Sequence, residues 1–110
     1  MSRIRVLFIC SRNQWRSPTA EAVYRDDPRL DVRSAGVSPS AKRRVSESLL
    51  RWADLVLVME HKHKARLRVQ FPGLLPALRI AVLDIDDDYE FMDPHLITLI
   101  RDRVEPLLLD

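Results

Sequence analysis

The chain has 110 residues, of which 46% are hydrophobic and 31% charged, and its formal net charge is +2 at pH 7. This size and composition predict one soluble globular domain, residues 1–110, with a single modest core. Two glycines exclude a glycine-rich nucleotide loop, and one cysteine excludes an internal disulfide and favours a reducing compartment.

The apolar runs are too short for a membrane helix or a secretory signal, so we expect a cytoplasmic protein with no membrane partner. The small net charge gives no indication of a nucleic-acid partner. Charged residues nevertheless gather in three places: basic clusters at 42–44 and 62–68, and an acidic run at 84–90. If the basic clusters flank a binding pocket, they favour acidic or phosphorylated substrates.

Apolar, β-branched segments alternate along the chain with segments that have helical character. Strands are predicted at residues 4–10, 30–36, 55–59 and 78–85. Helices are predicted from Ser17-Pro18 to about residue 27, at 45–52, at 61–71, and from Asp93-Pro94 onward, with Pro106 kinking or ending the last one. This alternation predicts a parallel sheet with helices on both faces and a ligand site beyond the carboxyl ends of the strands.

The stretch ICSRNQWRSP, residues 9–18, joins the first strand to the first helix. A helix N-terminus presents backbone N–H groups and a positive dipole end, which suit a tetrahedral oxyanion. Arg16 adds a planar fork for two oxygens, and the same positive field favours the thiolate form of a cysteine such as Cys10. A thiolate below a bound phosphate can attack phosphorus. Ser17 can stabilise the sulfur, and Asn13 can brace the loop. A buried core thiol is the plain alternative for Cys10.

The segment VLFICSRNQWRSPTAEAV resembles the signature of the low-molecular-weight protein tyrosine phosphatases, and RSAG and ADLVLVMEHKH resemble that family's second and third strands. The resemblance implies a four-stranded parallel sheet of order 2-1-3-4 with flanking helices. It also implies phosphomonoester hydrolysis through a cysteinyl-phosphate without metal or other cofactor. On matching positions, Cys10 is the nucleophile, Arg16 clamps the phosphate, and Asn13 and Ser17 support the loop.

Three departures from the family pattern are visible. Arg12 stands where the family usually has glycine, so it is strained if that position needs an unusual backbone angle. Trp15 replaces a second loop cysteine, so the nucleophile cannot be protected by a disulfide. The segment at 37–52 is shorter than usual, which predicts a more open pocket and puts a preference for phosphotyrosine in question.

The leaving group needs a proton, and a carboxyl group after the fourth strand can supply it. Asp87 matches the family's general acid if Tyr89 is the aromatic residue of that loop. Asp88 and Asp93 are the competing candidates, although Asp93-Pro94 is also a good helix start. We favour Asp87.

The remaining candidates for substrate binding are Ser11, Arg12, Gln14 and Trp15 from the loop, with Tyr89 stacking on the substrate. Trp15 either lines the pocket mouth or packs on the first helix. His61 and His63 do not share a helix face, so no metal site is expected.

The sequence therefore predicts a cysteine-dependent phosphatase acting on a phosphorylated protein or a small aryl phosphoester. The alternatives are a catalytically silent module that binds phosphorylated residues and an arsenate reductase that relies on an external thiol.

Overall fold

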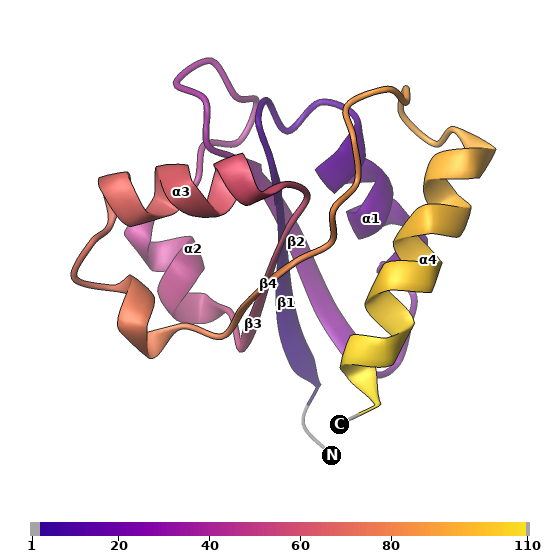
Figure 1. The fold of residues 1–110 in the computed structure, drawn as a ribbon. Coiled ribbons are helices and arrows are strands. Elements are labelled where there is room, and N and C mark those ends of the chain that lie inside the picture. Colours follow the sequence, from indigo (N-terminus) through magenta and orange to yellow (C-terminus); the bar gives the residue numbers. More distant parts are fainter. Residues whose placement is uncertain (1–2, 110) are drawn as a thin grey trace.

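The computed structural model describes residues 3–109, which form one four-stranded parallel sheet covered by helices (Figure 1). The strands are β1 (Ile4–Cys10), β2 (Leu30–Gly36), β3 (Leu55–Val58) and β4 (Ile80–Val82). They lie in the order β2-β1-β3-β4, and every pairing is parallel. The α/β fold and the strand order 2-1-3-4 implied by the family resemblance are confirmed.

Four α-helices flank the sheet: α1 (Arg16–Tyr24), α2 (Glu47–Trp52), α3 (His61–Gln70) and α4 (Pro94–Leu108), with a short 3-10 helix at Leu75–Ala77. Helices α1 and α4 lie on one side of the sheet, and α2 and α3 lie on the other (Figure 1). Helices on both faces were predicted from the alternating pattern. None of the helices within residues 3–109 combines the length and apolar character needed to cross a membrane.

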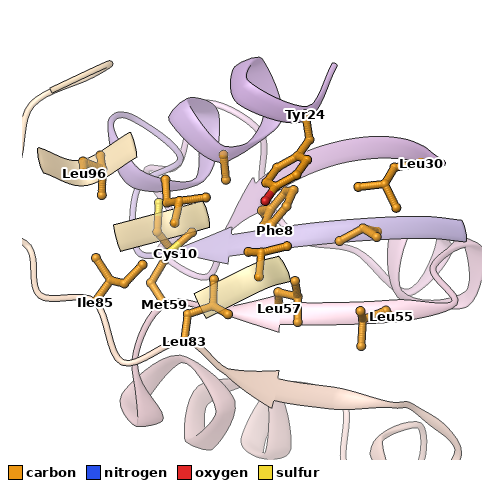
Figure 2. Close-up of a cluster of buried hydrophobic side chains, with 14 residues drawn as sticks. Phe8, Cys10, Tyr24, Leu30, Leu55, Leu57, Met59, Leu83, Ile85 and Leu96 are labelled. Atoms are coloured by element: carbon orange, nitrogen blue, oxygen red, sulfur yellow. The ribbon is translucent and has the colours of Figure 1, made fainter. Parts of the chain in front are cut away.

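Strand β1 is the centre of the core because its side chains alternate between the two faces of the sheet. Phe8 and Cys10 belong to the apolar cluster under α1 and α4 (Figure 2), whereas Leu7 and Ile9 belong to the cluster under α2 and α3. Phe8, Leu7 and Ile9 are fully buried, and each contributes on the order of 1.5–3 kcal/mol through removal from water. This burial holds the end of β1, and therefore Cys10, in a fixed position.

Several predicted boundaries are wrong. Helix α1 begins at Arg16, not at Ser17, and Trp15 at its N-cap makes no capping hydrogen bond through its side chain. The Ser17 hydroxyl does not cap the helix because it contacts Cys10 and Asn13 instead. The same helix ends at Tyr24, earlier than predicted.

Three other elements also differ in length from the prediction. Helix α2 begins at Glu47, because Ser46 caps it through a hydrogen bond from the N–H of Leu49. Strand β4 has three residues, although the N–H groups of Leu83 and Ile85 continue to donate to the end of β3 and beyond. Helix α4 continues through Pro106. This proline lies in the last turn, so the hydrogen bond lost with its missing N–H is close to the end of the helix.

Gly36 at the end of β2 lies beside the end of β1 and against the loop that follows it. A Cβ atom at Gly36 would meet the Ser11 carbonyl oxygen at 2.5 Å and the Asn13 nitrogen at 2.8 Å. Both are backbone atoms, so the loop itself would have to move. Glycine is therefore required here because the two backbone segments approach closely. Its φ is not positive, so backbone conformation is not the reason.

We expect Gly36→Ala to lower the free energy of unfolding by about 1–3 kcal/mol, because the new methyl group displaces packed backbone. Gly73→Ala is the matched control, since a Cβ at Gly73 meets nothing within 4 Å. The measurement is urea unfolding of both variants. Equal midpoints for the two variants would show that the backbone approach at Gly36 does not constrain the loop.

Candidate active site

The loop between β1 and α1 forms the floor of a cavity of about 240 Å³ at the carboxyl edge of the sheet. Asp87 reaches the same cavity from the segment after β4. The residues that line it are Cys10, Ser11, Arg12, Gln14, Trp15, Arg16 and Asp87. The loop of the first strand and the acidic run after the fourth strand therefore meet, as expected for the carboxyl ends of parallel strands.

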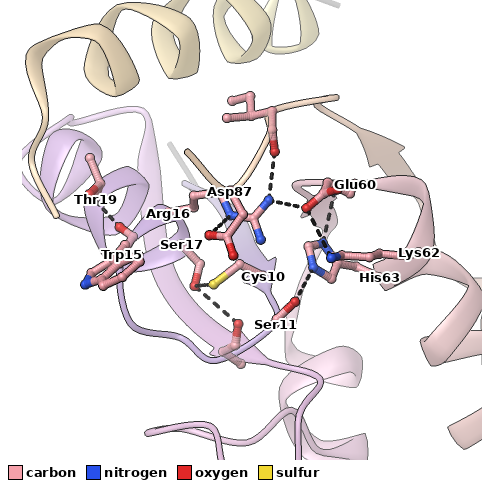
Figure 3. A network of polar contacts seen from close by, with 12 residues as sticks. Cys10, Ser11, Trp15, Arg16, Ser17, Thr19, Glu60, Lys62, His63 and Asp87 are labelled. Carbon is pink, nitrogen blue, oxygen red and sulfur yellow. Dashed lines mark hydrogen bonds and ion pairs between the residues drawn. The ribbon is translucent and has the colours of Figure 1, made fainter. Parts of the chain in front are cut away.

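The thiol of Cys10 is buried, and its Sγ atom lies 3.0 Å from Ser17 Oγ (Figure 3). Asn13 Nδ2 donates to Ser17 Oγ and to Ser34 Oγ, both at 2.9 Å. Because Ser17 Oγ already accepts from Asn13, its own proton is free to point at the sulfur or at the Ala35 carbonyl, 3.3 Å away. The serine is thus arranged to donate a hydrogen bond to a thiolate.

The backbone of the loop takes its one left-handed conformation at Asn13, where φ is 53°. Asparagine tolerates this region better than most residues. Arg12 has no positive φ, so the strain considered for Arg12 does not arise at that position. Behind the loop, Ser34 Oγ donates to Glu21 Oε1 at 2.5 Å, which completes a buried polar chain from Glu21 to Asn13.

Arg16 is 2% exposed, so its charge depends on acceptors supplied by other elements. Its Nη1 atom donates to Glu60 Oε1 at 2.5 Å and to the Ile85 carbonyl at 2.8 Å, and its Nε atom lies 3.4 Å from Asp87 Oδ1 (Figure 3). Partial burial of Glu60 disfavours its charge, but the hydrogen bond and charge of Arg16 outweigh this and leave the pKa of Glu60 below its usual value. The guanidinium is therefore held over the cavity by the ends of β3 and β4.

His63 connects the start of α3 to the loop. Its Nδ1 atom accepts a hydrogen bond from the backbone N–H of Glu60 at 3.0 Å, and its Nε2 atom lies 2.9 Å from Ser11 Oγ. A neutral ring whose Nδ1 accepts carries its proton on Nε2, so His63 donates to Ser11. Burial, followed by the charge of Arg16, lowers the pKa of His63 to about 4.

Of the other predicted residues, some line the cavity and some do not. Trp15 lines it and is 38% exposed. Tyr89 does not line it, because its half-buried side chain packs against the core cluster under α1 and α4. Asp88 is exposed and does not line the cavity. Asp93 caps α4, where its side chain accepts from the N–H of His95 at 2.8 Å. Asp87 is thus the aspartate at the cavity in the described part of the chain.

Sequence reasoning missed three residues that hold the loop: Glu60, Ser34 and His63. Glu60 comes two residues after the buried strand β3, at the same sheet edge as Cys10, which is a signal that could have identified it. Ser34 and His63 gave no comparable signal, because their contacts depend on the packing of β2 and α3. Within residues 3–109, no group of three or more His, Cys, Asp or Glu side chains could hold a metal ion.

Comparisons with known proteins agree with this geometry. No family model matches the chain. The protein-arginine-phosphatase of Bacillus subtilis (strain 168) is 34% identical in an alignment that covers 60% of this chain and 62% of that protein. The chain therefore spans less than two thirds of the length of this curated relative.

Solved structures match over nearly the whole chain. The YwlE arginine phosphatase from Geobacillus stearothermophilus is 25% identical, with a TM-score of 0.70 and coverage of 96% of this chain and 88% of that one. A low molecular weight protein tyrosine phosphatase from Bacillus subtilis is 26% identical, with a TM-score of 0.68 and coverage of 96% and 92%. In fold and in sequence, the chain is similar to low-molecular-weight protein tyrosine phosphatases and to arginine phosphatases. Its loop has arginine and tryptophan at positions 12 and 15.

The buried, neutral His63 makes the stability of this protein depend on pH. Its pKa is about 4 in the folded chain against a reference value of 6.5, so the unfolded state binds the proton more tightly. The stabilisation is present above pH 6.5 and is lost as the pH falls toward 4. Between pH 7 and pH 5 we expect a loss of about 2 kcal/mol, measured by urea unfolding.

His63→Gln removes this titration and is expected to unfold with a much flatter pH dependence over that interval. His61→Gln is the control, because His61 lies on the same helix and is exposed. A pH dependence in His63→Gln as steep as that of the unsubstituted chain would contradict the assignment.

Proposed function

We propose that this chain is a cysteine-dependent phosphatase that hydrolyses phosphomonoesters through a cysteinyl-phosphate on Cys10. One observation carries the proposal: Cys10 Sγ lies 3.0 Å from Ser17 Oγ in a cavity that Arg16 and Asp87 also line. A core thiol needs no such surroundings. We propose further that residues 1–110 form a single phosphatase domain and that it acts on a phosphorylated protein or an aryl phosphoester.

In the first step, the phosphoryl oxygens bind to the N–H groups at the N-terminus of α1 and to Arg16. The guanidinium can turn from Asp87 to these oxygens, which leaves the carboxyl group facing the leaving group. The Cys10 thiolate attacks phosphorus, the P–O bond to the leaving group breaks, and Asp87 gives its proton to the departing oxygen.

In the second step, water attacks the phosphorus of the cysteinyl-phosphate while the Asp87 carboxylate takes a proton from that water. The S–P bond breaks, inorganic phosphate leaves, and the sulfur returns to the thiolate. The Ser17 hydroxyl donates to the sulfur in the free enzyme and again as the sulfur leaves, so it lowers the barrier of the second step.

Cys10→Ser should abolish hydrolysis of para-nitrophenyl phosphate, because an alkoxide is not available at neutral pH in place of the thiolate. The assay monitors release of nitrophenol in a metal-free buffer. Circular dichroism and urea unfolding of the variant check that it is folded. Undiminished turnover by folded Cys10→Ser would refute the proposal.

Asp87→Asn should reduce turnover of the same substrate by about 100-fold or more, since the amide cannot deliver a proton. Asp88→Asn is the control, because Asp88 is adjacent and lies outside the cavity lining. Asp93→Asn is expected to weaken the cap of α4 and therefore stability, with little change in turnover. A large loss of turnover in Asp93→Asn but not in Asp87→Asn would move the general acid to Asp93.

A second candidate substrate is phosphoarginine, whose phosphoryl group is attached to nitrogen. The cavity wall favours it in one respect, because Ser11, Gln14 and Asp87 line the cavity together with a single aromatic side chain, Trp15. A carboxylate and neutral oxygens suit a guanidinium leaving group. The named activity of the Bacillus subtilis relative supports the same substrate. Turnover of phosphoarginine and phosphotyrosine peptides of one sequence distinguishes the two.

A further inference from the structure

Two grooves open beside the cysteine cavity and share lining residues with it. The first, with a volume of about 580 Å³, shares Gln14 and Trp15 with that cavity. The second, with a volume of about 480 Å³, shares Ser11. A polypeptide whose phosphorylated residue enters the cavity can therefore continue into either of the two adjoining grooves.

Both grooves have basic side chains on their walls. Lys42 and Arg43 line the first groove, and Lys62 and Arg66 line the second. All four are exposed. Within residues 3–109, Lys62 forms an ion pair with Glu60 at 3.7 Å, whereas the other three form none. Residues from both basic clusters of the sequence thus line grooves next to one cavity, with most of their charge uncompensated.

We propose that these two grooves bind acidic side chains that flank the phosphorylated residue of a protein substrate. This inference rests on the proposed function, because it concerns what surrounds the phosphoryl group in the same site. Each contact is an exposed ion pair of modest energy, and several together give a measurable preference. The short segment at 37–45 makes the arrangement possible, because it brings Lys42 and Arg43 to the rim through the hydrogen bond from the Lys42 N–H to the Arg12 carbonyl.

The acidic side of the cavity favours a protein over a nucleic acid as the partner. Asp86, Asp87 and Asp88 are exposed after β4, and Asp87 forms part of the cavity wall. A nucleic acid carries a charge at every nucleotide and would bring phosphates against these carboxylates. A peptide can place acidic residues over the grooves alone. The first groove also contains Glu21, whose carboxylate is engaged by Ser34, and exposed Phe91, which offers apolar contact.

The experiment compares two phosphotyrosine peptides of equal length, one with glutamates and one with glutamines on both sides of the phosphorylated residue. The readout is the ratio of their kcat/KM values at low and at high ionic strength. We expect the glutamate peptide to be preferred about tenfold at about 0.05 M salt and about twofold at about 0.5 M salt. Using the ratio removes any effect of a substitution that acts equally on both peptides.

Charge reversal tests the two grooves separately. Lys42→Glu with Arg43→Glu should remove or invert the preference, and Arg66→Glu should reduce it. Lys64→Glu with Arg68→Glu is the matched control, because these residues lie on α3 and line a different cavity. That control changes the net charge by the same amount as the variant with Lys42→Glu and Arg43→Glu, and it should leave the ratio unchanged.

The outcomes separate this inference from the proposed function. If para-nitrophenyl phosphate is hydrolysed but the peptide ratio is near one, or the control variant changes it equally, the grooves do not select acidic flanks. If a 5′-phosphorylated oligonucleotide is the better substrate, the partner is a nucleic acid and the inference is overturned. If no phosphate ester is hydrolysed, the proposed function fails, and the affinities of Cys10→Ser for the two peptides still decide the inference.

Discussion

The hydrogen-bond chain from Asn13 through Ser17 to Cys10 is the interaction on which the rest of the site depends. Asn13 donates hydrogen bonds to the hydroxyl oxygens of Ser17 and Ser34, and this leaves the proton of Ser17 for the sulfur. The geometry requires Asn13 in a left-handed conformation and Gly36 without a side chain. Buried polar chains of this kind are stable only when every member is satisfied, and no buried side-chain nitrogen or oxygen in the described residues lacks a partner.

The helices around the sheet hold the loop between β1 and α1 in place from opposite sides. Helix α1 supplies Ser17 and Glu21, and the start of α3 supplies His63, while Glu60 at the N-cap of α3 holds Arg16. The guanidinium is the point where these contacts converge, since it also reaches Asp87 beyond β4. Arg16, which follows β1 in the chain, therefore contacts groups that follow β3 and β4.

Much of this could be predicted because it follows from local patterns. The buried run before Cys10 and the Ser-Pro pair after Arg16 place the loop between a strand and a helix, and the alternation along the chain predicts the parallel sheet. The start of α1 was misplaced because Ser17 has a tertiary use that overrides its capping preference. The packing of Tyr89 into the core and the contact of His63 with Ser11 could not be predicted, since both depend on how distant elements meet.

The central claim is that Cys10 forms a covalent bond to phosphorus during turnover. The most direct measurement is mass spectrometry of the enzyme after acid quenching during hydrolysis of excess para-nitrophenyl phosphate. The account predicts one added phosphoryl group on the peptide that contains Cys10, formed within a single turnover. Steady hydrolysis with no phosphoryl group on Cys10 at any quench time, or with the group on another residue, would contradict it.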